Sequence, residues 1–449
     1  NNASVTGSTV TTGALSSSGD PTASTDSPFD DPAGFKFGEN GDQNVIKCGS
    51  YKGSSSSTVD VELGFEPQWV LIKNSTGTSD WYIGDALRGT VTGEHDARLY
   101  ANDYNAEVTN EDHIDFTPTG FKAKNNDGST NDDHTHVYVA IRRPDGYVGK
   151  PAEAGTDVFA MDTGADSSTI PNFDSGFTVD MGIYRRPATV QDWFLATRLL
   201  QGKENIVNTD AATSNYNKAV FDSNLGWQNE STHGSSYQSW MWKRHAGFDV
   251  VTYTGNDTAR WLPHNLNGVP EMIWVKRRSS TGNWWVYHVG ANGGSNPEGK
   301  ELVLNTTAAE VGTNFWAVPT STHFYIGGSS HVNDTGTTHL VMLFRSVAGI
   351  SKIGYYTGNG SATGPSISVG FQPRFIIIKA ASQSGPWRVL DTLRDTLGSG
   401  TDKELSLNTN AAQGDHTDWL DITSTGFDIK TSDGEANASS GKYIYYAHA

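Results

Sequence analysis

The sequence predicts an all-β protein made of four tandem β-sandwich modules that are jelly-roll-like in form. Three observations predict this fold: the composition, a motif that recurs four times at nearly constant spacing, and short apolar runs separated by turn residues. The 449 residues include 49 Gly, 13 Trp, 17 Tyr and 18 Phe, without a long stretch of Ala, Leu, Glu and Lys. Such a mixture favours strands joined by turns over helices.

Each copy of the motif opens with a turn that leads into an apolar strand. It reads GFEPQWVLIKN from Gly64, GFTVDMGIYRR from Gly176, NGVPEMIWVKR from Asn267 and GFQPRFIIIKA from Gly370. Continuous runs such as VLIK and FIIIK are typical of a strand that is buried on both faces. Each copy closes with a further strand, and in HVYVAIRR the residues alternate between the two faces of a sheet.

Two aromatic columns accompany the motif at fixed distances. A Trp lies eight residues after the basic residue of the apolar strand, an Asn follows it after 21, 15, 21 and 21 residues, and an aromatic residue lies 19 residues after the Asn. A residue present in every copy is explained most simply by the fold of the module. We therefore predict that both columns are structural core residues: Trp81, Trp193, Trp284 and Trp387, and Phe121, Trp227, Phe324 and Phe427.

The repeat defines the predicted domain boundaries. Residues 1–43 form a low-complexity N-terminal arm or linker, because the first 28 residues are rich in Ser, Thr, Gly and Ala and contain no aromatic residue. Because the chain does not begin with Met, we expect that Asn1 is not the start of the gene product. The modules are predicted at 44–145, 146–246, 247–348 and 349–449, and the second, which has the shorter loop, is the divergent copy.

Charge and cysteine content exclude several classes of partner. The formal charge of −18 gives an acidic surface that repels phosphate backbones, so we predict no nucleic-acid partner. No apolar run approaches the roughly 20 residues of a membrane helix, and we predict no membrane insertion. The single cysteine, Cys48, excludes a disulfide within the chain, and we expect it to be a small buried hydrophobic residue.

The sequence contains no G-x-S-x-G nucleophile motif of hydrolases, no P-loop and no G-x-G-x-x-G dinucleotide-binding motif between a strand and a helix. We therefore predict that the protein is not an enzyme and binds no cofactor. His134 and His136 beside two aspartates, or the acidic loop 125–133, could suggest a metal site. The corresponding segments of the other copies are plain hairpins, and we predict no metal. Arg88 and Arg394 each follow an Asp by three residues, which predicts a local ion pair that fixes a turn.

Recognition of a ligand is expected from aromatic residues that lie outside the two columns. An exposed indole can stack on a sugar or on a partner protein. Ordinary packing within or between modules is the alternative explanation for each of them. The candidates are Trp240, Trp242, Trp261 and Trp285.

The strings GFEPQWVLIKN, GFQPRFIIIKA, LVLNTTAAE, TGFDIK and YIYYAHA give the chain a family resemblance. Over residues 30–449 it resembles the large virion and tail-fibre proteins of marine phages, whose repeats carry a Gly-Phe-x-Pro-x-aromatic strand, a Trp, an Asn-Thr segment and a Tyr-rich closing strand. Copy two departs from this pattern at Val179, where the others have Pro. The resemblance supplies no catalytic residue.

This resemblance implies a structural protein of the extracellular virion. We expect a tail-fibre or adhesin subunit that contacts other virion subunits and binds a host surface glycan or protein. Such subunits are usually homo-oligomers and often trimers. Alternatives are a head or tail decoration protein without a receptor, a capsular polysaccharide depolymerase, and a cellular surface adhesin.

Overall fold

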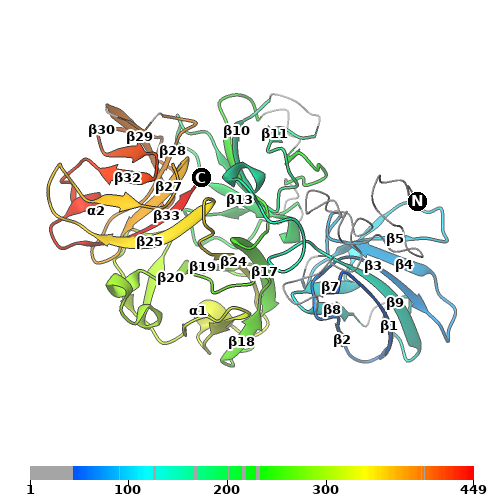
Figure 1. Cartoon of the computed structure of the whole chain (residues 1–449). Helices are drawn as coiled ribbons and strands as arrows, with labels where there is room; N and C mark the ends of the chain where they lie inside the picture. Colours follow the sequence, from blue (N-terminus) through cyan, green and yellow to red (C-terminus); the bar gives the residue numbers. More distant parts are fainter. Residues whose placement is uncertain are drawn as a thin grey trace, which may run out of the picture.

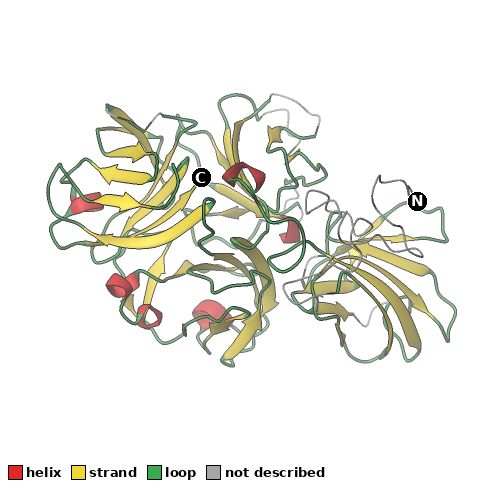
Figure 2. Ribbon diagram, viewed as in Figure 1, coloured by secondary structure: helices red, strands yellow, loops and turns green. Residues whose placement is uncertain are grey.

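The computed structural model describes residues 44–449 except 91, 125–127, 166–169, 201, 215–218, 229–232, 396 and 399. The predicted arm at 1–43 therefore lies outside the described residues. The described part is nearly all β, with 33 strands and only short helical segments (Figure 2). None of its helices has the length and apolar character needed to cross a membrane. The all-β sandwich fold predicted from the sequence is confirmed.

Residues 44–145, here called module 1, form a large and a small antiparallel sheet. The large sheet has the order β1-β9-β3-β4-β5-β6 and the small sheet the order β2-β8-β7. Apolar residues between the two sheets form the sandwich core, for example Ile72 and Tyr82 from the large sheet and Phe121 from the small one. The strands are β1 (Ile46–Lys52), β2 (Val59–Glu62), β3 (Pro67–Asn74), β4 (Trp81–Asp85), β5 (Asp96–Tyr100), β6 (Val108–Glu111), β7 (Ile114–Thr117), β8 (Gly120–Ala123) and β9 (Thr135–Arg142).

Residues 146–246, module 2, form a reduced version of the same sandwich. The large sheet has five strands, β10-β16-β12-β13-β14, and the small sheet has two, β11-β15. Its strands are β10 (Phe159–Thr163), β11 (Phe173–Asp174), β12 (Met181–Arg185), β13 (Phe194–Thr197), β14 (Asn205–Ile206), β15 (Gly226–Trp227) and β16 (Gln238–Trp242). Two 3₁₀ turns, Gly155–Asp157 and Arg198–Leu200, also lie in this module.

Residues 247–348, module 3, have the large sheet β17-β24-β19-β20-β21-β22 and the small sheet β18-β23. The elements are β17 (Phe248–Thr254), β18 (Arg260–Pro263), β19 (Met272–Arg277), β20 (Trp284–His288), β21 (Lys300–Val303), β22 (Val311–Gly312), β23 (His323–Ile326), α1 (Ser330–Asn333) and β24 (Thr338–Phe344). Two 3₁₀ turns, Ala291–Gly294 and Pro297–Gly299, precede β21.

Residues 349–449, module 4, repeat the strand order of module 1, as β25-β33-β27-β28-β29-β30 and β26-β32-β31. The elements are β25 (Ser351–Thr357), β26 (Ser366–Ser368), β27 (Phe375–Ala380), β28 (Trp387–Asp391), β29 (Thr401–Ser406), β30 (Gly414–Thr417), β31 (Leu420–Thr423), β32 (Gly426–Ile429), α2 (Gly434–Asn437) and β33 (Lys442–His448).

The Gly-Phe turn recurs because its first residue has a left-handed backbone. Gly64, Gly176 and Gly370 have φ of 85°, 77° and 88°, and Asn267 takes the same place with φ of 52°. Only Gly adopts this region without a steric cost, and Asn tolerates it better than most residues. The first residue of the motif is therefore Gly or Asn because the turn needs a positive φ at that position.

Modules 2, 3 and 4 pack around a shared centre, and module 1 lies to one side of them (Figure 1). The largest apolar cluster in the described residues is formed by these three modules alone, with Trp193, Trp284 and Trp387 among its members. Its residues belong to the face of each large sheet that is turned away from the small sheet. We call this the outer face, and we call the three modules the ring.

A buried cluster of charges joins module 1 to the ring. The guanidinium of Arg244 binds both carboxylate oxygens of Glu66, at 2.7 and 2.6 Å, and its Nε donates to Asp249 at 2.8 Å. Arg143 donates to the same two carboxylates at 3.3 and 3.2 Å. Burial alone would raise the pKa of Asp249, but Arg244 and Arg143 lower it below its ordinary value. Module 1 is held at this junction by ion pairs shielded from water.

The prediction that the Trp column is structural core is confirmed for Trp193, Trp284 and Trp387 and is wrong for Trp81, and the core in question lies between modules. All four Trp residues lie on the outer face of their large sheets, so they do not fill the sandwich core of a module. Trp193, Trp284 and Trp387 are buried because the other ring modules cover them, whereas Trp81 is 41% exposed. The second column, Phe121, Trp227, Phe324 and Phe427, is buried inside the sandwiches.

Two further expectations concern single residues. Cys48 is exposed on the outer face of β1, so the expectation that it is buried is wrong. The predicted Asp–Arg pairs are confirmed, because Arg88 and Arg394 each donate Nε to the Asp three residues earlier at 2.7 Å. The same Asp also accepts the backbone N–H of the Arg, which closes the turn.

Candidate functional site

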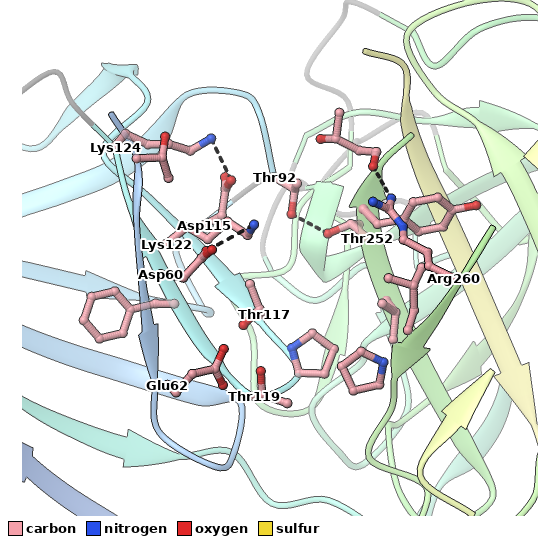
Figure 3. A pocket seen from close by; sticks show the side chains of 18 residues that line it. Asp60, Glu62, Thr92, Asp115, Thr117, Thr119, Lys122, Lys124, Thr252 and Arg260 are labelled. Atoms are coloured by element: carbon pink, nitrogen blue, oxygen red, sulfur yellow. Dashed lines mark hydrogen bonds and ion pairs between the residues drawn. The ribbon is translucent and has the colours of Figure 1, made fainter. Parts of the chain in front are cut away.

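A groove runs between the small sheet of module 1 and the strands β17 and β18 of module 3 (Figure 3). Its volume is about 440 Å³. Apart from the core residue Phe121, the module 1 strand residues that line the groove face away from the sandwich core, because residues on a strand alternate between the two faces. Six threonines line the groove: Thr58, Thr92, Thr117, Thr119, Thr252 and Thr254.

Acidic and basic side chains of this groove neutralise one another. Lys124 binds Asp115 at 2.7 Å, and Lys122 binds Asp60 at 3.1 Å. Arg260 donates to the carbonyl of Thr254, and the hydroxyls of Thr92 and Thr252 bond to each other across the groove. The groove therefore presents hydroxyls and paired charges without a surplus of either sign.

Burial would lower the pKa of Lys124, but Asp115 and Asp112 outweigh it and raise the pKa. Burial, with help from Asp115, raises the pKa of Asp112 to about 6. Burial lowers the pKa of Arg260. The charged form is therefore favoured only at Lys124, whereas burial disfavours the charged forms of Asp112 and Arg260. No nucleophile with an adjacent base accompanies them among the lining residues.

An exposed aromatic pair lies on the strand that borders the groove. Trp261 is 45% exposed and sits on β18 between Arg260 and Leu262, two of the residues that line the groove. It pairs across the strands with Tyr325, and the two rings meet edge to face with centroids 5.3 Å apart. Their side chains lie on the solvent face of the small sheet.

The position of this pair breaks the repeat. The strand registers place Asp60 and Lys122 of module 1, and Ser366 and Asp428 of module 4, where module 3 has Trp261 and Tyr325. Polar residues therefore suffice for the sandwich fold at these positions. The sandwich fold itself does not require aromatic residues at these two positions.

The other three aromatic candidates are not exposed. Trp240 and Trp242 lie at the ring centre, where their Nε1 atoms donate to Asp391 at 3.1 Å and to the hydroxyl of Tyr446 at 3.2 Å. Trp285 faces the sandwich core of module 3 and stacks on His331 with centroids 4.1 Å apart. The expectation that these indoles could stack on a ligand is wrong, and Trp261 alone remains.

Sequence reasoning did not find the groove. Its walls come from two modules that are separated by more than 100 residues, so no local spacing brings Asp115 and Arg260 together. A departure from the repeat, Trp261 on the strand beside the groove, was the only signal available.

No group of His, Cys, Asp and Glu that could hold a metal ion occurs among the described residues. His134 contacts Asp132 at 2.8 Å, and His136 stacks on Tyr51. The acidic loop considered for calcium includes residues 125–127, which lie outside the described part.

The chain matches the family described as domain of unknown function DUF7483 over residues 34–143 and 206–449. The protein belongs to the DUF7483 family. Residues between the two matched segments, 144–205, hold the first half of module 2, which is the divergent copy. No curated protein matches the sequence. DUF7483 membership therefore covers both walls of the groove and the Trp261–Tyr325 pair.

Proposed function

We propose that this DUF7483 protein is a non-catalytic phage virion protein, a tail-fibre or adhesin subunit that binds a host surface glycan. The exposed pair of Trp261 and Tyr325, at a position where other modules have polar residues, carries the proposal. A sugar stacks its apolar face on an indole and uses its hydroxyls for hydrogen bonds. The groove on the other side of β18 carries threonine hydroxyls and charged groups, but neither Trp261 nor Tyr325 is among the residues that line it, so it would be a separate contact for a longer glycan.

The place of the protein in a virion rests on the sequence resemblance. Tandem sandwiches provide a rigid scaffold, and recognition by such scaffolds commonly resides at loops and strand edges. The acidic chain, with its net charge of −18, favours an uncharged or weakly charged polysaccharide over a strongly anionic one.

The test is binding of the full-length protein to host cells, and competition with phage adsorption. Trp261→Ala should weaken binding by about two- to tenfold, because an aromatic contact contributes about 0.5–1.5 kcal/mol. Ser366→Ala, at the equivalent position of module 4, is the matched control and should change nothing.

Different outcomes separate the alternatives. Loss of binding after periodate oxidation of the host surface supports a glycan, and loss after protease treatment instead indicates a protein receptor. Protein that neither binds cells nor blocks infection would reject the adhesin in favour of a decoration protein. Release of oligosaccharides from host capsule would reject the non-catalytic part of the proposal.

A further inference from the structure

The outer faces of modules 2, 3 and 4 contact one another by one set of bonds that repeats around the ring. In each ring module, the Trp of the first aromatic column donates its indole Nε1 to a backbone carbonyl of a neighbouring module. This carbonyl lies two residues before the Asn that accompanies the Trp in the repeat, which is Asn208, Asn305 or Asn408. The pairs are Trp193 with Ser406 (2.8 Å), Trp284 with Ile206 (3.2 Å) and Trp387 with Val303 (3.0 Å).

A second set of equivalent bonds involves the carbonyl two residues after the same Asn. It accepts the backbone N–H of the residue two before the Trp: Gln191 to Asn410, Gly282 to Asp210 and Gly385 to Thr307, at 2.8–2.9 Å. The basic residue of each apolar strand binds the same carbonyl. These bonds run from Arg185 to Asn410 (3.2 Å), Lys276 to Asp210 (3.1 Å) and Lys379 to Thr307 (3.4 Å).

The pattern closes on itself. Module 3 donates to module 2, module 4 donates to module 3, and module 2 donates to module 4. Each module thus uses two different patches, one that donates and one that accepts. Heterologous contacts of this kind produce a ring, and three modules complete it here.

Module 1 has the same residues but none of the ring modules covers them. Its Trp81 and Val137 are 41% and 40% exposed, whereas their equivalents Trp284 and Leu340 in module 3 are fully buried. The spacing of 21 residues from Trp81 to Asn102 equals that of modules 3 and 4. The apolar outer face of module 1 includes Ile46, Cys48, Leu71, Trp81, Ile83, Leu99, Val137, Val139 and Ile141, all exposed or half-buried.

The contacts of module 1 with the ring leave most of this face open; only at its end does Trp69 line a pocket shared with Asp180 and Arg198 of module 2. Arg143, Glu66 and the loop around Thr92 make those contacts, and they belong to the side of the small sheet and the ends of the strands. In Figure 1 the large sheet of module 1, with β1, β9, β3 and β4, lies on the side away from the ring.

We propose that the outer face of module 1 binds two further copies of this chain and forms a homotrimer. Three copies of module 1 then repeat the arrangement of modules 2, 3 and 4. The Nε1 of Trp81 donates to the carbonyl of Tyr100 in the next subunit. Lys73 and the backbone N–H of Ser79 bind the carbonyl of Tyr104, a residue whose side chain is 98% exposed in the single chain.

A second copy fits this face better than an unrelated partner, because the chain itself contains the complementary surface. The donor patch around Trp81 and the acceptor patch around Asn102 lie on the same module, as in the ring. A two-fold dimer could also pair a donor patch with an acceptor patch, but the relation between successive modules of the ring closes after three, and this relation favours a trimer. The inference holds whether or not the protein binds a glycan.

The test is the mass of the full-length protein in solution by light scattering, which should be three times the 48.4 kDa of the chain. Trp81→Glu and Val137→Glu should each convert the trimer to a monomer. Val318→Glu, at a residue of module 3 that is 57% exposed, should remain trimeric. An unchanged unfolding midpoint of the ring would show that the variants are folded.

Cys48 provides an independent measurement, because it lies on the same face and is the single cysteine. Its reaction with a maleimide should be at least tenfold slower in the trimer than in Trp81→Glu. A dimer, a monomer, or a trimer that survives both substitutions would overturn the proposal. A monomer in which Cys48 is nevertheless protected would also overturn it, and would show that another part of the same chain covers the face.

Discussion

At the scale of single residues, the Asn column has a defined structural role. The side-chain oxygen of each Asn accepts the backbone N–H of the Trp in the same module, at 2.7–2.9 Å. This bond ties the strand that begins at the Trp to the segment after the next strand. The constant partner explains why Asn persists although the loop between them is six residues shorter in module 2, 15 against 21.

Asn408→Ala tests this role. Asn408 is buried, so the substitution leaves the N–H of Trp387 without its acceptor and should cost about 1–3 kcal/mol of unfolding free energy. Asn102→Ala, made in the Val137→Glu background in which the subunits should not associate, is the matched control and should cost less, because water can reach the exposed N–H of Trp81 in the single chain. Equal costs in denaturant titrations would contradict the explanation.

At the scale of elements, the turn before each apolar strand depends on one backbone conformation. The amide of Gly370 donates to the carbonyl of Thr425 at 3.0 Å, and Gly64 donates to Thr119 at 2.9 Å in the same way. The turn thus anchors the start of the large-sheet strand to the small sheet. A side chain at this residue would have to adopt left-handed φ.

Gly370→Ala should therefore lower the unfolding free energy by about 1–2 kcal/mol. Its φ of 88° imposes strain on Ala although no neighbouring atom lies within 4 Å of the new Cβ. Gly312→Ala is the control, since that glycine also has open space around it but lacks a left-handed φ. Thermal unfolding that is equally affected in both variants would show that strain at the turn is not the cause.

At the scale of the whole molecule, the ring buries titratable groups between modules. His448 of module 4 packs on Phe159 of module 2, with ring centroids 4.5 Å apart. Burial lowers the pKa of His448 to about 3 and that of His288, which contacts Tyr445, to about 4. Both histidines are therefore neutral in the folded ring at neutral pH.

Acidification should weaken the ring through His448. The unfolded chain binds a proton below a pKa of about 6.5 and the folded protein does not, so stability is lost as the pH falls through that value. The loss from this residue is about 2 kcal/mol at pH 5. Comparison of the wild type with His448→Gln at pH 7.5 and pH 5 isolates it, because all other groups titrate in both proteins. If the unfolding free energies of the wild type and of His448→Gln fall equally between pH 7.5 and pH 5, the loss does not come from His448.

The sequence by itself determined the fold class, the four copies and the second aromatic column. These features depend on local propensity, alternation and constant spacing, which every copy repeats. It also indicated Trp261, because that residue departs from the repeat.

Only the tertiary structure decided what the Trp column does. The same Trp is buried in three modules and exposed in module 1, since its environment is set by neighbouring modules and not by its own strand. The groove likewise joins residues from modules 1 and 3. Contacts between modules leave no periodic signal within one copy, so the ring, the groove and the uncovered face of module 1 required the three-dimensional arrangement.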